Sequence, residues 1–183
     1  LNMGEVYANI RKYNDALLLF DSTLNMADRH GLVNLKAKAY RAIGKIKFKQ
    51  GKYDEALRNF EKTLAIQQQR RSKYNRARVL NNIAGVYQLQ GKYDQALDIY
   101  QHALEINNNI KNRFGAAQNL KNIATCYMNL KNYPKVEAAL NTGIQMALMT
   151  DVKNLILKYY RNFISLCEHT GQHDSAHHYF DKY

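Results

Sequence analysis

The feature that most constrains this chain is a short pattern that returns every 40 residues. Gly51-Lys52-Tyr53-Asp54 is followed by Gly91-Lys92-Tyr93-Asp94. The same step along the chain reaches related residues at three further places. Because the register holds through five units without an insertion, the chain is predicted to be an array of structural repeats. Turns are expected at residues 11–14, 51–54, 91–94, 131–134 and 171–174.

Apolar residues on both sides of each turn follow the spacing of a helix face. Before the turn at 91–94 they are Leu80, Ile83, Ala84 and Tyr87. This i, i+3, i+4, i+7 spacing is typical of an amphipathic helix. After each turn a second stripe appears, and in the last unit it consists of Ala176, Phe180 and Tyr183. The chain is therefore predicted to be all-α, with about nine antiparallel helices and no strand.

Residue size along the stripes predicts how the helices pack. Small residues such as Ala84 and Ala124 are expected to be buried where two helix backbones approach closely. Glycine after a helix adopts the left-handed conformation that closes the helix C-terminus. Arg11 and Lys131 occupy the position of that glycine in two units. Those two turns are expected to be slightly strained or to be shaped by the following residue.

The order of a small-residue helix, a Gly-x-Tyr turn and an Ala-x-x-x-aromatic helix resembles the tetratricopeptide repeat. The period of 40 residues exceeds the usual 34 of that family. The extra residues are expected to form longer helices plus a short loop. This long variant is similar to kinesin light chains and to the sensing halves of bacterial regulators. The resemblance implies a right-handed superhelical solenoid in which the first helix of each hairpin lines a concave groove.

The array is expected to be a single domain of five units that are partial at both ends. Their approximate limits are 1–30, 31–71, 72–111, 112–150 and 151–183. Terminal repeats normally carry a polar capping helix. Here Phe180 and Tyr183 would be left uncovered. Self-association through the uncapped ends is therefore expected, or an additional helix in a longer parent chain.

The first-helix face that points away from the apolar stripe is strongly basic. It carries one acidic residue, Glu5. Its basic residues are Lys38, Arg41, Lys45, Lys49, Arg78, Lys121, Lys158 and Arg161. The whole chain has 27 Lys and Arg against 15 Asp and Glu, so the ratio of basic to acidic residues is higher on this face than in the whole chain. An adjacent column contains an asparagine in four of the five units, at Asn2, Asn82, Asn122 and Asn162. Asn81 lies on the same side of its helix.

Asparagine carries both hydrogen-bond donors and an acceptor, which suits contact with an extended peptide backbone. Neighbouring cations would select acidic side chains or a terminal carboxylate. The face is therefore predicted to bind an extended acidic peptide or protein segment. Two alternatives remain open: a scaffold that uses its convex face or its ends, and a nucleic-acid binder that uses the same basic face. The asparagines could instead serve only to bond neighbouring hairpins.

No enzyme, cofactor or metal ion is predicted. The sequence contains no phosphate-binding loop, no nucleophile elbow and no paired acid and base carboxylates. His169, His173, His177 and His178 cluster near Cys167, but a turn interrupts them and His173 replaces a repeat tyrosine. The two cysteines, Cys126 and Cys167, are interpreted as buried thiols.

The sequence does not determine the cellular compartment of the protein. No apolar stretch has the length of a membrane span and no signal-peptide pattern opens the chain. These features favour a soluble domain in the cytoplasm. A periplasmic location would follow if an upstream leader precedes Leu1.

Overall fold

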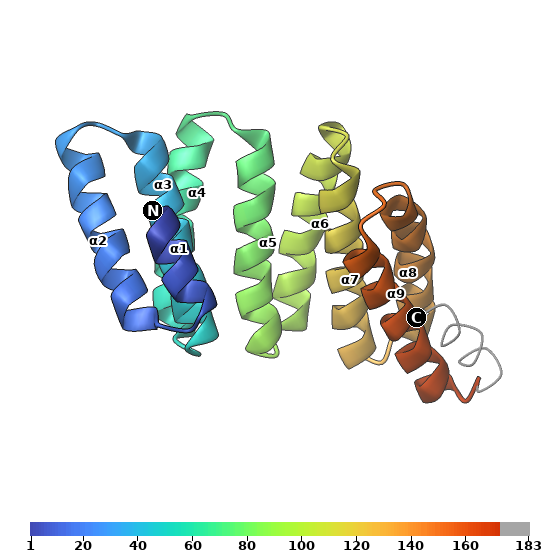
Figure 1. Cartoon of the computed structure of the whole chain (residues 1–183). Coiled ribbons are helices and arrows are strands. Elements are labelled where there is room, and N and C mark those ends of the chain that lie inside the picture. Colours follow the sequence, from blue (N-terminus) through green and yellow to red (C-terminus); the bar gives the residue numbers. More distant parts are fainter. Residues whose placement is uncertain (173–183) are drawn as a thin grey trace. The chain divides into compact units, whose positions relative to one another are not determined.

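The computed structural model describes residues 1–172, which contain nine α-helices and no strand (Figure 1). Successive helices are antiparallel, so the predicted all-α fold of helical hairpins is confirmed for this part of the chain. The second stripe of the last unit, which includes Phe180 and Tyr183, lies outside the described residues. So do His173, His177 and His178. The helices are α1 Asn2–Asn9, α2 Tyr13–Arg29, α3 Val33–Lys49, α4 Tyr53–Gln69, α5 Lys73–Leu89, α6 Tyr93–Asn109, α7 Arg113–Asn129, α8 Tyr133–Leu148 and α9 Lys153–Thr170.

The chain forms two compact units, Leu1–Val86 and Tyr87–Tyr183, and the division falls within α5. In the first unit α1 packs on α2, α2 on α3 and α3 on α4. In the second unit α6 packs on α7, α7 on α8 and α8 on α9, and α7 also touches α9. Each unit thus consists of helices that pack mainly on their neighbours along the chain, as expected for stacked repeats.

The helices and their connections follow a uniform rhythm. Helices α2 to α7 each contain 17 residues, and α8 and α9 contain 16 and 18. The link at 70–72 between two hairpins is as short as the link at 50–52 inside one hairpin. The extra residues of the long repeat therefore lengthen the helices, as predicted. The turns begin slightly earlier than predicted, because Tyr13, Tyr53, Tyr93 and Tyr133 already start the next helix.

Each connection is closed by one residue in the left-handed backbone region. In the link between α3 and α4 that residue is Gly51, with φ of 74°. Its N–H donates to the Phe48 carbonyl at 3.1 Å, and the Lys52 N–H donates to the Lys47 carbonyl at 2.9 Å. These two bonds form a Schellman motif, which satisfies carbonyls left over at the helix end.

Residues other than glycine occupy this position in five connections. Arg11 and Lys131 have φ of 61° and 56°, so both predicted strained turns are confirmed. Three more such residues were not predicted, because they lie between hairpins rather than at the Gly-x-Tyr turn. They are Arg71, Lys111 and Asp151.

The strain predicts that Lys131→Gly will stabilise the protein. A side chain at positive φ costs on the order of 1 kcal/mol, and glycine avoids that cost. Part of the gain is offset by the greater freedom of glycine in the unfolded chain. We expect the midpoint of urea denaturation to rise. In the control, Gln101→Gly on the exposed face of α6, it should fall, since glycine inside a helix costs about 1 kcal/mol. A fall in both variants would contradict the assigned strain.

Small residues allow large rings to pack against helix backbones. Gly44 in α3 lies against Phe60 of α4, and a Cβ placed on it would come within 2.6 Å of the ring. Gly4 meets Phe20 of α2 in the same way, at 2.7 Å. The predicted burial of small residues is confirmed at Ala84 and Ala124, which are 0% and 1% exposed.

Gly44→Ala should therefore destabilise the first unit. Overpacking typically costs about 1–3 kcal/mol, which exceeds the gain of about 1 kcal/mol from the better helix propensity of alanine. The double variant Gly44→Ala with Phe60→Leu should lose less than the sum of the two single variants, because the smaller side chain gives way to the new methyl group. The measurement is a double-mutant cycle of urea denaturation. Additive losses would show that the two positions are not coupled.

The first helix exposes an apolar stripe. Met3 and Val6 are 64% and 59% exposed, whereas Ile43 and Ile46, which stand 40 residues later, are buried beside Ala16 of α2. In α1 no helix covers the equivalent face within the described residues. Self-association through this end stays a prediction.

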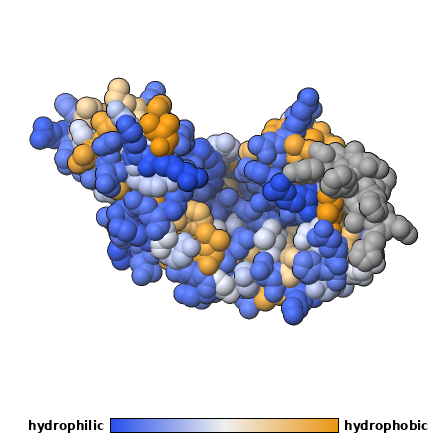
Figure 2. Space-filling model, turned by 60° about the horizontal axis from the view of Figure 1, so that its bottom comes forward, coloured by the Kyte–Doolittle hydropathy of each residue, from blue (hydrophilic) through white to orange (hydrophobic). Residues whose placement is uncertain are grey.

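On the face that Figure 2 draws, the described residues are mainly hydrophilic and the hydrophobic residues form separate patches. Within residues 1–172 no helix has both the length and the apolar character of a membrane span. Cys126 and Cys167 are free and buried, as predicted.

Candidate functional site

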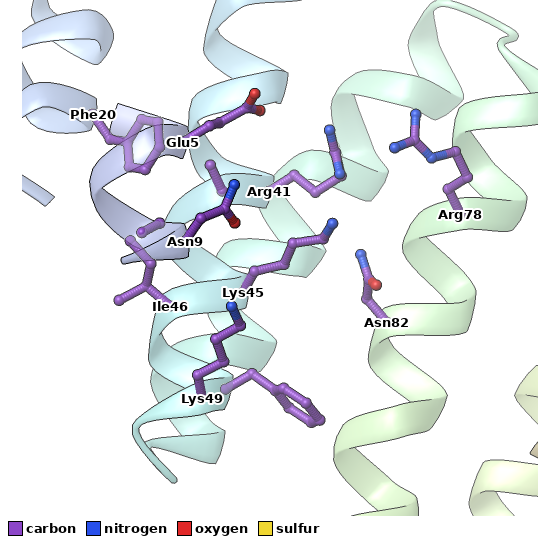
Figure 3. Close-up of a pocket in the computed structure, with 12 residues that line it drawn as sticks. Glu5, Asn9, Phe20, Arg41, Lys45, Ile46, Lys49, Arg78 and Asn82 are labelled. Atoms are coloured by element: carbon purple, nitrogen blue, oxygen red, sulfur yellow. The ribbon is translucent and has the colours of Figure 1, made fainter. Parts of the chain in front are cut away.

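The largest cluster of predicted site residues surrounds a cavity of about 520 Å³ in the first unit. Helix α3 contributes Arg41, Lys45 and Lys49, and α5 contributes Arg78. We call these four cations and their cavity the cationic pocket. In Figure 3 Arg41 and Lys45 reach from α3 toward α5, and Arg78 and Asn82 point back from α5. Their placement follows from the helix period, because Arg41, Lys45 and Lys49 are separated by four residues each and lie on one face.

The positive charge of the cationic pocket has little compensation within the protein. Glu5 of α1 is the one acidic residue among those that line it. Ion pairs in residues 1–172 involve other lysines, in Lys36–Asp28, Lys47–Glu55 and Lys52–Glu55. Like charges held close together repel one another and lower the stability of the free protein.

Burial and neighbouring charges together lower the pKa values of two cations in this pocket, and Glu5 acts on both in the opposite direction. Burial, followed by the nearby charge of Arg78, lowers the pKa of Arg41. Lys45 is exposed overall, yet the packing of protein around its ammonium group lowers its pKa, and the charges of Arg41, Arg78 and Lys49 lower it further. An anion bound in the pocket would raise the pKa values of both Arg41 and Lys45.

The cationic pocket also has apolar and amide walls. Ala8 and Ala42 line it together with Phe48, which packs against Tyr53 with 6.2 Å between ring centres. Asn9 of α1 lies beside Glu5. Ala8, Asn9 and Phe48 were not predicted from the sequence as part of the site. The residues that correspond to Phe48 in the next two units are Gln88 and Met128, so no repeated pattern marks this position.

The structure separates two other predicted residues of the first unit from this pocket. Lys38 lines a smaller cavity of about 60 Å³, which shares Arg41 and Arg78 with the cationic pocket. Asn81 is half-buried on α5 and lines neither cavity. Asn82 is thus the one predicted asparagine of this unit that faces the four cations.

In the second unit the predicted residues lie on α7 and α9. Lys121 is half-buried, and its pKa is lowered by burial and then by the charge of Lys158. Asn162 lines a cavity of about 110 Å³ together with Ala124 and Thr125. Asn122 is half-buried and Arg161 is exposed. The pair of Lys121 and Lys158 repeats, on a smaller scale, the juxtaposition of like charges in the first unit.

Other asparagines of the second unit have a structural role. The Asn107 amide donates to the Asn119 Oδ1 at 2.7 Å, and the Asn112 amide donates to the Asn107 Oδ1 at 2.7 Å. Asn107 and Asn119 are almost completely buried. The network joins the end of α6 to the start of α7, and it also fills the space beside Gly115, where a Cβ would meet Asn107 at 2.5 Å. These residues lie in other columns of the repeat than Asn82, Asn122 and Asn162.

Residues 1–172 hold no group of three or more His, Cys, Asp or Glu side chains that could bind a metal ion.

A family model described as "Tetratricopeptide repeat" matches the chain in three overlapping segments, residues 1–69, 35–109 and 75–149. No curated protein sequence matches the chain.

Solved structures show the same fold at low sequence identity. BtubC (BKLC) from P. vanneervenii is 16% identical, with a TM-score of 0.84 over 98% of this chain and 74% of that one. A Podosopora anserina putative kinesin light chain with TPR-like repeats is 13% identical, with a TM-score of 0.78 over 99% of this chain and 89% of that one. A Rap protein complexed with Competence and Sporulation Factor is 15% identical, with a TM-score of 0.84 over 98% of this chain. The chain spans about half the length of that Rap protein, 50%. The predicted solenoid fold class, and its likeness to kinesin light chain repeats, are confirmed.

Proposed function

Since the chain belongs to the tetratricopeptide repeat family and is a protein-interaction module, we propose that it binds an extended, acidic segment of a partner protein. The binding surfaces are the basic faces of the first helices of the hairpins. In the first unit this surface is the cationic pocket with Asn82. In the second unit it consists of Lys121, Asn122, Lys158, Arg161 and Asn162.

The observation that carries the proposal is the excess of positive charge in the cationic pocket. Four cations surround one cavity with a single acid among the lining residues. A cluster of this kind disfavours the folded state unless it binds an anion. Charge-assisted hydrogen bonds to carboxylates are about twice as strong as neutral ones. An acidic partner would therefore offset the repulsion between the cations, because its negative charge attracts each of them.

Asn82 would contact the backbone of the bound peptide, whereas the cations would contact its charged side chains. Its side chain faces the cavity from α5, four residues after Arg78 and thus one turn further along the helix. An amide at this point offers a donor and an acceptor to a peptide group of an extended ligand, whatever its sequence. The cations would then select the side chains that follow.

A role in regulation is part of the proposal. A Rap protein with the same fold was solved in complex with Competence and Sporulation Factor. Tetratricopeptide repeat proteins are generally non-enzymatic interaction scaffolds. We infer that this chain is the interaction part of a regulatory protein and has no catalytic activity of its own.

Charge reversal tests the binding surface of the first unit. A pool of short peptides with glutamates at its centre should bind the wild-type chain in a fluorescence anisotropy titration, and Arg78→Glu should weaken that binding at least about tenfold, since a charge-assisted contact contributes about 1.5–3 kcal/mol. The matched control is Arg58→Glu on the exposed side of α4, outside the cationic pocket. Equal weakening in both variants would indicate a general charge effect. Equally tight binding of unrelated duplex DNA, with a steep dependence on salt, would favour a nucleic-acid partner.

A second pair of substitutions tests the second unit. Changing Lys121 and Asn122 together to Ala should weaken binding of the natural partner at least about tenfold, because one amide contact and one charge-assisted contact are lost. The thermal melting curve of the variant should stay close to that of the wild type. Unchanged affinity would place the partner on the convex face or at the ends. A marked loss of stability would show that Asn122 has a structural role, like Asn107 and Asn119.

A further inference from the structure

The charge of the cationic pocket restricts which anion can neutralise it. Two guanidinium groups, of Arg41 and Arg78, and two ammonium groups, of Lys45 and Lys49, line one cavity with Glu5. A single glutamate or aspartate side chain carries one negative charge. Bound alone, it would leave most of the positive charge uncompensated.

The geometry of the donors leads to the same restriction. One guanidinium group saturates both oxygens of a carboxylate through two parallel hydrogen bonds. Arg41 and Arg78 come from different helices and reach into the same cavity from α3 and α5, and both also line the smaller cavity beside Lys38. A group with three terminal oxygens and nearly two negative charges can accept hydrogen bonds from both guanidinium groups and from an ammonium group at once. A phosphoryl group has these properties.

We propose that the cationic pocket receives a phosphorylated serine, threonine or tyrosine side chain of the partner protein. This inference rests on the proposed function, because it names the side chain that the acidic segment inserts into the first unit. Arg41 and Arg78 bind the phosphoryl oxygens, and Lys45 and Lys49 balance the remaining charge. Asn82 stays available to the peptide backbone beside the phosphorylated residue.

The apolar wall of the pocket fits the stem of such a side chain. Ala8, Ala42 and Phe48 line the cavity together with the cations. The volume of about 520 Å³ falls within the range of pockets that enclose a small molecule, so the cavity holds a whole side chain with its phosphoryl group. A free inorganic anion would leave the apolar wall uncovered.

The same arrangement makes a trade-off between stability and binding. Arg41, Lys45 and Arg78 carry like charges around one cavity, and like charges held close together repel one another in the free protein. A neutral side chain in place of Lys45 removes part of this repulsion and also removes a charge that attracts the ligand. Lys45→Gln should therefore raise the melting temperature of the free chain and weaken phosphopeptide binding. A lysine with a purely structural role would lower the melting temperature when replaced.

The test uses immobilised pools of short peptides with degenerate flanks and one fixed central residue. The central residue is phosphotyrosine, phosphoserine, glutamate or serine, and binding of the whole chain is measured by surface plasmon resonance. Inorganic phosphate is titrated as a competitor at constant ionic strength. We expect at least one phosphorylated pool to bind about tenfold or more tightly than the glutamate pool, because additional charge-assisted hydrogen bonds are formed.

Matched variants assign the effect to the pocket. Arg78→Gln and Arg41→Gln should reduce the affinity for the phosphorylated pool to about that for the glutamate pool. Arg58→Gln, which makes the same change of side chain on α4, should leave it unchanged. If all three variants lose the preference equally, the cationic pocket is not the phosphoryl site and the inference is wrong.

Three further outcomes separate this inference from the proposed function. Equal affinity for the glutamate and phosphorylated pools, both weakened by Arg78→Gln, would overturn phosphoryl recognition and leave acidic-peptide binding intact. If inorganic phosphate competed as well as a phosphopeptide, the proposal that the phosphoryl group belongs to a peptide side chain would be wrong. Absence of binding by every pool would count against both proposals for the first unit.

Discussion

The left-handed residue that closes each helix is the constraint on which the rest of this structure depends. At Gly51 the chain reverses within three residues, because the Schellman hydrogen bonds end one helix and the next helix begins immediately. With such short links successive helices are antiparallel, and α1 to α4 and α6 to α9 pack against their neighbours along the chain. Helix length is then uniform, since a longer or shorter helix would shift the next link out of register with the one before it. The chain tolerates arginine, lysine or aspartate at positive φ in five links, which shows that the reversal matters more than the local strain.

This regular frame places residues 40 positions apart on equivalent faces, yet the two units use these faces differently. In the first unit the face forms a cavity with four cations and an apolar wall. In the second unit the charge of Lys158 acts on Lys121, and Asn162 lines a smaller cavity that neither lysine lines. Repeats conserve the direction of a side chain more strictly than its identity. Function can therefore vary from unit to unit without a change in the backbone.

Buried amides and clustered cations are two distinct uses of polar residues in this fold. Asn107, Asn112 and Asn119 satisfy one another and join two helices, so their contribution is to stability. Arg41, Lys45 and Arg78 carry like charges around one cavity and cannot pair with one another, and we propose that their role is to attract an anion. The difference follows from charge. Amides carry donors and an acceptor and can pair among themselves, whereas cations carry only donors.

Sequence by itself determined the helical hairpins, their register and the basic face with Glu5 as its single acid. It also determined the strained links at Arg11 and Lys131, because the glycine of the repeated turn is missing there. These are angular and local properties, which follow from the helix period and from the backbone preferences of single residues. Only the tertiary structure decided that Arg41, Lys45, Lys49 and Arg78 share one cavity while Lys38 lines another. The apolar wall at Phe48 was likewise a matter of packing, because the distance between side chains on α1, α3 and α5 depends on how closely these helices approach. The helix period determines the direction of a side chain, and only packing determines what it meets.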